Sequence, residues 1–313
     1  MTDVVAPQLS YWLPSWSAKD PGGWRHLRDA ARIADETGID RVVVSDHVVF
    51  GENLDAYGDP ALGGSAGGRQ PTGPDGHWLD PLTVLTYVAG FTDTVRLGTA
   101  ILIAALRRPV VLAKELATLD VLSGGRVDLG VGVGWQREEY QAAGLDFEGR
   151  GRLLDHTLEV CQTLWRQQRA SFADDLLRFD ATHQMPKPLQ PGGVPIWVSG
   201  TFNRNVVRRL AAYGSGWIPW GPAAEDLPSS IPRMKQAMTD AGRTDAGALQ
   251  VVGFLPMAYE GRTVNLEATI AATKPLLDAG VTDFRVSLRF TGDFDTDKGT
   301  VFDIVDAFSK AFR

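Results

Sequence analysis

Short runs of apolar and β-branched residues alternate with amphipathic stretches along the chain, and this alternation restricts the fold more than any other feature. The runs predict eight strands, at 8–13, 41–45, 95–103, 126–131, 195–199, 216–220, 249–255 and 284–288. The stretches that follow them predict eight helices, at 22–36, 80–91, 108–122, 150–168, 203–213, 225–241, 263–278 and 299–312. Strict alternation over 313 residues predicts an α/β fold, a (β/α)8 TIM barrel with insertions that forms a single domain over 1–313.

Three joints between a helix and the next strand share one feature, a glycine directly after the helix. These are Gly38 in ETGIDRVVV, Gly214 in AYGSGWIPW and Gly280 in DAGVTDFRV. A glycine just past a helix end can adopt the left-handed conformation that closes the last turn. The sequence therefore predicts helix-to-strand loops closed in this way.

Two stretches interrupt the alternation. Residues 51–79 are rich in Gly, Pro and Asp and follow the second strand, which places this insertion at the C-terminal face of the barrel. It is either a mobile lid or a disordered surface loop, and its position at the catalytic face favours the lid. The extension at 169–192 lies on the opposite side, between the fourth helix and the fifth strand, which favours a structural role.

Charge and composition exclude several kinds of partner. The net charge of −7 leaves no broadly basic surface for nucleic acid. The first residues lack the pattern of a signal peptide and no apolar stretch approaches about 18 residues, so we expect a cytoplasmic protein without a membrane partner. The single cysteine, Cys161, shares helical spacing with Leu154, Leu158 and Trp165, which predicts a core position.

The stretch GRVDLGVGVGWQREEY, residues 125–140, carries three alternate glycines: Gly130, Gly132 and Gly134. It fails the dinucleotide-binding fingerprint, which requires glycine where this chain has Trp135 or Arg137. What remains is a strand that ends in a turn of small residues, followed by the start of a helix. Such a turn lets a ligand lie against the backbone.

The run LGTAILIAALRRPVVLAKELATLDVLSGGRVDLGVGVGWQREEY, residues 97–140, resembles the core signature of the luciferase-like monooxygenase superfamily of flavin and deazaflavin oxidoreductases. It is most similar to actinobacterial members that use coenzyme F420. SDHV at 45–48 and the segments 149–165 and 194–220 support the resemblance, which covers most of residues 9–220. The resemblance implies a (β/α)8 barrel with the cofactor held across the C-terminal ends of the strands.

Asp46 and His47 follow the second strand directly, at the face where barrel enzymes do their chemistry. Histidine is the side chain best suited to moving a proton near neutral pH. In F420-dependent relatives the matching pair lies beside the deazaflavin ring, so the resemblance implies that His47 and Asp46 are catalytic. The other histidines are expected at the surface or at helix caps.

After the third strand, the resemblance implies cofactor contacts at Ala100 and Ile101, in a bulge with a non-prolyl cis peptide that backs the ring. Arg107 either holds an acidic cofactor tail or a substrate carboxylate, or forms a solvated pair with Arg108. These two interpretations are about equally favoured by the sequence.

The next cofactor contacts implied by the resemblance are Gly132, Gly134 and Trp135. Trp135 stands where the sugar-phosphate dehydrogenases of the family carry a catalytic glutamate, which argues against their substrate and supplies an aromatic wall. Glu138, Glu139 and Tyr140 open the helix that follows. The two glutamates suit a helix N-terminus, whereas Tyr140 either reaches a cofactor phosphate or packs within the helix layer.

Ser199, Gly200 and Thr201 close the fifth strand before a helix N-terminus, and in relatives this segment holds the cofactor phosphate. Trp220 is expected on the pocket wall and Trp217 in the core. Arg204 is expected either to add charge to the phosphate site or to face solvent. Arg289, just past the eighth strand, is a weaker candidate for a substrate anchor.

Together these features predict an oxidoreductase that transfers a hydride between F420 and a small, apolar organic substrate. Trp12, Trp16, Trp135 and Trp220 suit an unsaturated or ring-bearing molecule. The alternative is an FMN-dependent monooxygenase that uses reduced flavin and O2, because both rings occupy the same strand ends. A non-catalytic binding protein is a further hypothesis, no metal site is predicted because the histidines are not clustered, and relatives favour a homodimer.

Overall fold

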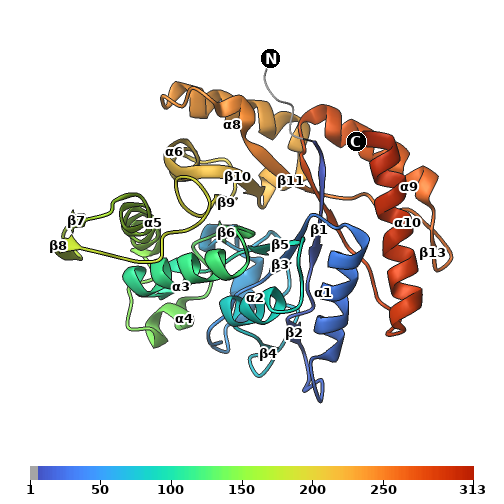
Figure 1. Cartoon of the computed structure of the whole chain (residues 1–313), viewed down its shortest axis with the longest axis horizontal. Coiled ribbons are helices and arrows are strands. Elements are labelled where there is room, and N and C mark those ends of the chain that lie inside the picture. Colours follow the sequence, from blue (N-terminus) through green and yellow to red (C-terminus); the bar gives the residue numbers. More distant parts are fainter. Residues whose placement is uncertain (1–5) are drawn as a thin grey trace.

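Eight parallel strands close into a barrel in the computed structural model, which describes residues 6–313 (Figure 1). The strands are β1 (Gln8–Trp12), β3 (Arg41–Val44), β5 (Arg96–Thr99), β6 (Val127–Val131), β9 (Ile196–Gly200), β10 (Gly214–Pro219), β11 (Gln250–Phe254) and β14 (Asp283–Val286). Their order around the barrel follows the sequence, and β14 pairs with β1 to close it. The predicted (β/α)8 barrel is confirmed.

A helix follows each barrel strand on the outside. These helices are α1 (Arg25–Thr37), α2 (Pro81–Ala89), α3 (Pro109–Leu122), α5 (Arg150–Arg166), α6 (Arg204–Tyr213), α8 (Leu227–Asp240), α9 (Leu266–Ala279) and α10 (Phe294–Phe312). The last helix begins five residues before the predicted start, because the side chain of Asp293 accepts the amide of Thr296 and caps it there. Two short helices, α4 (Arg137–Ala142) and α7 (Pro222–Glu225), lie in loops at the C-terminal face.

The glycine joints are confirmed at two of three positions. Gly38 and Gly280 cap α1 and α9 in the left-handed conformation, with φ of 86° and 103°. The prediction is wrong for Gly214, whose φ of −74° is extended and which begins β10. A Cβ there would lie 2.6 Å from Leu210, so the position needs glycine for a close approach instead.

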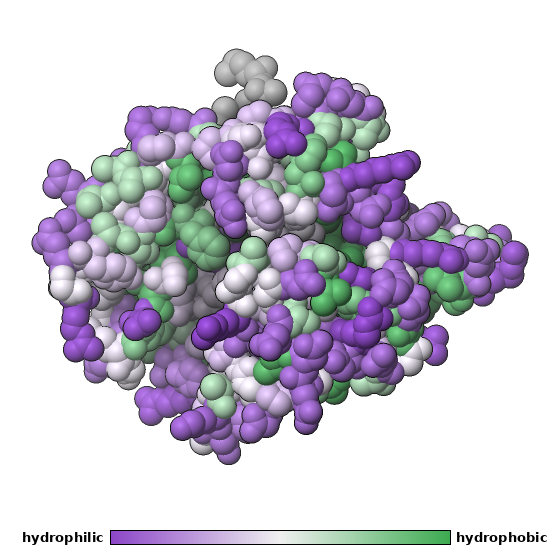
Figure 2. Space-filling model, turned by 180° about the vertical axis from the view of Figure 1, so that it is seen from behind, coloured by the Kyte–Doolittle hydropathy of each residue, from purple (hydrophilic) through white to green (hydrophobic). Residues whose placement is uncertain are grey.

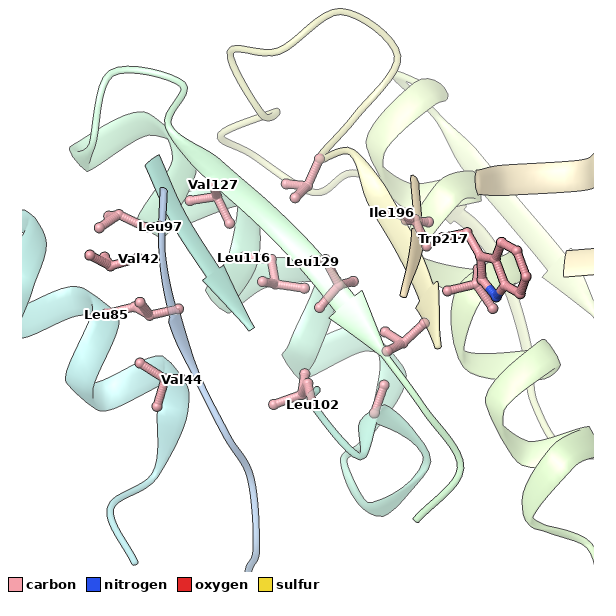
Figure 3. Close-up of a cluster of buried hydrophobic side chains, with 14 of the residues drawn as sticks. Val42, Val44, Leu85, Leu97, Leu102, Leu116, Val127, Leu129, Ile196 and Trp217 are labelled. Carbon is pink, nitrogen blue, oxygen red and sulfur yellow. The ribbon is translucent and has the colours of Figure 1, made fainter. Parts of the chain in front are cut away.

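The main hydrophobic core lies between the strands and the surrounding helices. Figure 3 shows Val42, Leu97 and Leu129 from the strands beside Leu85 of α2 and Leu116 of α3, and all five are buried. Trp217 and Cys161 are also fully buried, as predicted. Burial of such side chains stabilises the fold by about 1.5–3 kcal/mol each.

Inside the barrel, near the N-terminal ends of the strands, lies a group of charged side chains that we call the interior ion network: Arg41, Arg96, Asp128 and Asp283. Arg41 pairs with both aspartates, at 2.8 Å to Asp128, and Arg96 binds Asp128 at 2.7 Å and 2.8 Å. Asp283 also accepts a hydrogen bond from the hydroxyl of Ser10. Each aspartate in this network is therefore already paired.

The insertion at 51–79 folds against the barrel. It contains two short 3-10 turns, Leu54–Gly58 and Pro60–Leu62, and strand β4 (His77–Trp78), which pairs with β2 (Trp16–Ser17) after β1. Trp220 Nε1 donates to the carbonyl of Gly64 at 3.0 Å, and Arg150 donates to that of Leu62 at 3.2 Å. These contacts tie the insertion to the C-terminal face.

The extension at 169–192 contains a hairpin of β7 (Ala170–Ala173) and β8 (Arg178–Thr182), which stands at the left edge of Figure 1 beside α5. A second small hairpin joins β12 (Tyr259–Glu260) to β13 (Thr263–Val264). Among residues 6–313, no helix is long and apolar enough to cross a membrane. Polar side chains cover most of the face that Figure 2 presents.

Candidate active site

A cavity of about 840 Å³ opens at the C-terminal ends of the strands, beneath the insertion. The predicted site residues that line it are Asp46, His47, Ala100, Ile101, Gly132, Gly134, Trp135, Ser199, Gly200, Thr201 and Trp220. The chain therefore brings together side chains that lie more than 170 residues apart in the sequence, because parallel strands end at one face of the barrel.

Asp46 is fixed by contacts with the chain that follows β5. Its carboxylate binds both Nη atoms of Arg107, at 2.6 Å and 3.0 Å, and accepts the amide of Ile103 at 2.8 Å. Burial raises the pKa of Asp46, against the opposing effect of the Arg107 guanidinium. Arg107 also binds Asp80 at 2.9 Å and is not among the residues that line the cavity. The structure therefore supports neither predicted role, that of an anion holder or that of a solvated cation; Arg107 instead positions Asp46.

His47 lies on the cavity wall in an aromatic environment. Its side chain is 8% exposed, and its ring packs within 4.3 Å of Phe50, 4.8 Å of Trp78 and 5.7 Å of Trp135, measured between ring centroids. Nδ1 faces Oε2 of Glu139 at 3.4 Å. This arrangement leaves Nε2 as the ring nitrogen available to a ligand.

Glu139 lies in the first turn of α4, as predicted, but its carboxylate also reaches the site. Its side chain is fully buried, and its Oε1 accepts the amide of Val48 at 2.6 Å. Among residues 6–313, neither Oε2 of Glu139 nor Nδ1 of His47 has a hydrogen-bond partner. The two buried polar atoms face each other at 3.4 Å, an arrangement suited to a carboxylate that orients an imidazole.

The wall opposite is built from backbone and small residues. The peptide between Ala100 and Ile101 is cis, as the resemblance implies. A Cβ on Gly132 would lie 2.9 Å from Cδ1 of Ile101, and Gly134 has a left-handed φ of 69°. The backbone conformation therefore requires glycine at 134, whereas a side chain at 132 would press against the end of Ile101; both glycines leave space beside the ledge that Ala100 and Ile101 form.

Aromatic residues close the cavity above this ledge. Tyr57, from the insertion, packs 5.4 Å from Trp135 and 6.2 Å from Trp220. Trp16 stacks on Trp78 at 5.5 Å and lines the same cavity. The insertion thus contributes cavity walls, Tyr57 and Trp78, that strand-end reasoning did not find.

Tyr140 does not line the cavity. Its ring is fully buried, and its hydroxyl donates to the carbonyl of Val133 at 2.6 Å. Burial raises the pKa of this phenol. Of the two predicted roles, packing within the helix layer is the one the structure supports.

Ser199, Gly200 and Thr201 line the cavity beside the start of α6, as expected from their place after β9. The side chain of Asn203 caps this helix and accepts the amides of Asn205 and Val206, both at 3.0 Å. These two amides already donate to Asn203, so they are not available to a ligand. Arg204 is exposed and faces away from the cavity lining.

Three arginines that the sequence reasoning missed line the cavity: Arg150, Arg209 and Arg285. Arg209 is bound to Asp155 at 2.7 Å, whereas Nε of Arg150 is buried without a hydrogen-bond partner among the described residues. The signal for Arg150 was the start of the helix, GRGRLLDH, where glycines flank the arginine near the phosphate segment. In the described part of the chain, no three His, Cys, Asp or Glu side chains are grouped to hold a metal ion.

The chain is similar to known proteins in sequence and in fold. An F420-dependent glucose-6-phosphate dehydrogenase of Kineococcus radiotolerans is 31% identical over 225 residues, which cover 70% of this chain and 60% of that protein. Two solved structures share the fold. An F420-dependent secondary alcohol dehydrogenase in complex with an F420–acetone adduct has a TM-score of 0.72 at 18% identity, over 97% of this chain and 99% of that one. A riboflavin lyase with modified FMN and riboflavin has a TM-score of 0.72 at 15% identity, over 97% and 91%.

The F420-dependent dehydrogenase at 31% identity supports an oxidoreductase, whereas the two solved structures show the shared fold. The model of one family, described as luciferase-like monooxygenase, matches residues 9–280. This range includes the barrel strands from β1 to β11 and the strand ends at which the site lies. Because this match spans most of its length, the chain belongs to the luciferase-like monooxygenase family.

Proposed function

We propose that this protein transfers a hydride between coenzyme F420 and a small organic substrate. The observation that carries the proposal is the placement of His47, oriented by Glu139, on the wall of a cavity that also holds the Ala100–Ile101 ledge. The F420-dependent relative with 31% identity supports this cofactor over FMN.

The residues present fit such a cofactor. Ala100 and Ile101 give an apolar ledge for a flat ring, and Gly132 and Gly134 keep the space beside it free. Ser199 and Thr201 would hold the phosphate of the cofactor tail. Arg150, whose buried Nε lacks a partner among the described residues, would add a charged donor there.

The protein's own contribution is to orient groups, exclude water and move a proton. When bound, the deazaflavin supplies a carbon that gives or takes the hydride. When the substrate carbon takes the hydride, Nε2 of His47 gives a proton to the oxygen bound to that carbon. In the reverse direction, Nε2 takes this proton from the oxygen. Trp135, Trp220 and Tyr57 keep water away from this exchange.

Titration with oxidised and reduced F420 and with FMN, followed by tryptophan fluorescence, tests the cofactor. We expect binding of F420 in the nanomolar to micromolar range and much weaker binding of FMN. Tight FMN binding with oxygen-dependent turnover would instead favour the flavin monooxygenase, and binding of neither would contradict the assigned site.

Replacing Glu139 with glutamine is expected to lower kcat by about 10- to 100-fold, because the amide no longer holds the imidazole as a carboxylate does. The amide of Val48 keeps an acceptor in this variant, so the unfolding midpoint should change little. The matched control is Glu138→Gln, which alters the adjacent carboxylate in α4. Equal kcat values for the two variants would rule out an orienting role for Glu139.

A further inference from the structure

Arg285 is a buried guanidinium on the cavity floor that lacks a carboxylate partner. It lies on β14, is 3% exposed and lines the cavity. Within residues 6–313, no carboxylate oxygen lies within 4.0 Å of it, and the only hydrogen bond of its guanidinium is a long one, 3.5 Å from Nε to the hydroxyl of Ser10. Burial lowers the pKa of Arg285 to about 10, which reflects the weak solvation of this charge.

In the described part of the chain no carboxylate forms a salt bridge with Arg285, although Asp283 on the same strand favours its positive charge. The interior ion network below it contains two aspartates, and both are bound to other arginines. Asp283, on the same strand, is taken by Arg41 and Ser10. Arg41 and Arg96 each form a salt bridge, whereas Arg285 forms none with the described residues and lines the cavity.

Such a charge is costly for a protein to keep. A buried ion without a partner destabilises the fold, whereas a buried ion with a well-placed partner does not carry this full cost. A ligand that carries a negative charge would supply the partner that Arg285 lacks. A guanidinium is suited to a carboxylate, which it binds through two parallel hydrogen bonds.

The position of Arg285 relates it to the proposed reaction. Its guanidinium lies over the ring of Trp12, 5.0 Å from the centroid, and Trp12 Nε1 donates to the hydroxyl of Ser45 at 2.7 Å. Ser45 directly precedes Asp46 and His47. A molecule anchored at Arg285 would therefore share the cavity with His47, which lines it too.

We propose that Arg285 binds the carboxylate of the substrate, so that the substrate class is a monocarboxylic acid with an apolar or aromatic body. The Arg285 guanidinium matches one negative charge, and Trp12, Trp16 and Leu288 line the same cavity with apolar surface. This inference deepens the proposed function and refines its substrate. Arg289, the anchor considered from the sequence, is exposed and is not part of the lining.

The test uses benzoate and its neutral analogue benzamide, titrated into the cofactor-free protein and followed by tryptophan fluorescence. We expect wild type to bind benzoate at least about tenfold more tightly than benzamide. Arg285→Met should abolish this preference and leave benzamide binding unchanged. The matched control, Arg289→Gln, removes a cation four residues further along the chain and should keep the preference.

Thermal unfolding without ligand separates a binding role from a structural one. If Arg285 is kept for a ligand, Arg285→Met unfolds at the same temperature as wild type or higher, because an unpaired buried charge is removed. A variant that unfolds several degrees lower and still prefers benzoate would overturn the proposal.

The cofactor itself is the other source of a negative charge, and F420 titration distinguishes it. Equal affinity of wild type and Arg285→Met for reduced F420 supports the substrate site. Loss of affinity for reduced F420 with the benzoate preference intact overturns it. If wild type prefers benzoate but does not bind F420, the proposed function fails and the carboxylate site stands.

Discussion

Replacing His47 with asparagine is expected to lower the rate of hydride transfer by about 10²- to 10⁴-fold, the usual contribution of a positioned general acid or base. Asparagine keeps a polar side chain on the wall but neither takes nor gives a proton in the working range. The expectation rests on the proposed function, and the measurement is the single-turnover change in F420 absorbance after mixing with substrate.

The loss should appear in the chemical step and not in cofactor affinity, because the ledge at Ala100 and Ile101 and the phosphate segment are untouched. His26→Asn is the matched control, since His26 lies on α1 away from the cavity lining. Because His47 packs against Phe50 and Trp78, the unfolding midpoint and a second variant, His47→Gln, check for loss of structure. A His47→Asn variant that folds, binds F420 and reacts within a few-fold of wild type would exclude a proton-transfer role.

The barrel was predictable because its signals are local. Runs such as RVVVS at 41–45 and RVDLGV at 126–131 show strand character within a few residues, and alternation with helices then restricts the topology. The errors fall where a tertiary contact decides. Gly214 is extended because it already pairs with Ile196 of β9 at the start of β10, which its own neighbourhood in the sequence does not reveal.

The site residues also divide into those that local sequence predicts and those that depend on tertiary contacts. His47 and Asp46 were predictable because a residue after a parallel strand lies at the catalytic face of a barrel. The partners of these residues come from distant segments, and their pairing depends on how loops fold back. Arg107 reaches Asp46 across 61 positions and Glu139 reaches the backbone of Val48 across 91, distances at which a single sequence gives no pairing signal.

The same limit applies to Arg285. In the sequence it is one of several basic residues near the eighth strand, and Arg289 has the better position for a strand-end anchor. The distinction depends on burial and on which carboxylates are already paired, and both are properties of the closed barrel. Which arginine lacks a carboxylate partner is therefore decided only when the barrel has closed.

Replacing Gly130 with alanine is expected to destabilise the barrel by more than about 4 kcal/mol, an exceptional cost for one methyl group. A Cβ at this position would lie 1.9 Å from the carbonyl oxygen of Thr99, which is backbone and has no rotamer to change. The two strands are tied there, since Thr99 Oγ1 donates to the Gly130 carbonyl at 2.7 Å and the Leu102 amide donates to it at 2.8 Å. Urea unfolding and the yield of folded protein measure the effect.

The matched control is Gly299→Ala, at an exposed position of α10 where a Cβ meets no atom within 4 Å. Alanine is the better helix former by about 1 kcal/mol, so this variant should be as stable as wild type or more so. The contrast separates the cost of a clash at Gly130 from any general effect of replacing glycine. Because the ledge beside Gly132 depends on the same approach of β5 and β6, a folded Gly130→Ala protein with wild-type stability and F420 affinity would refute the packing argument for both glycines.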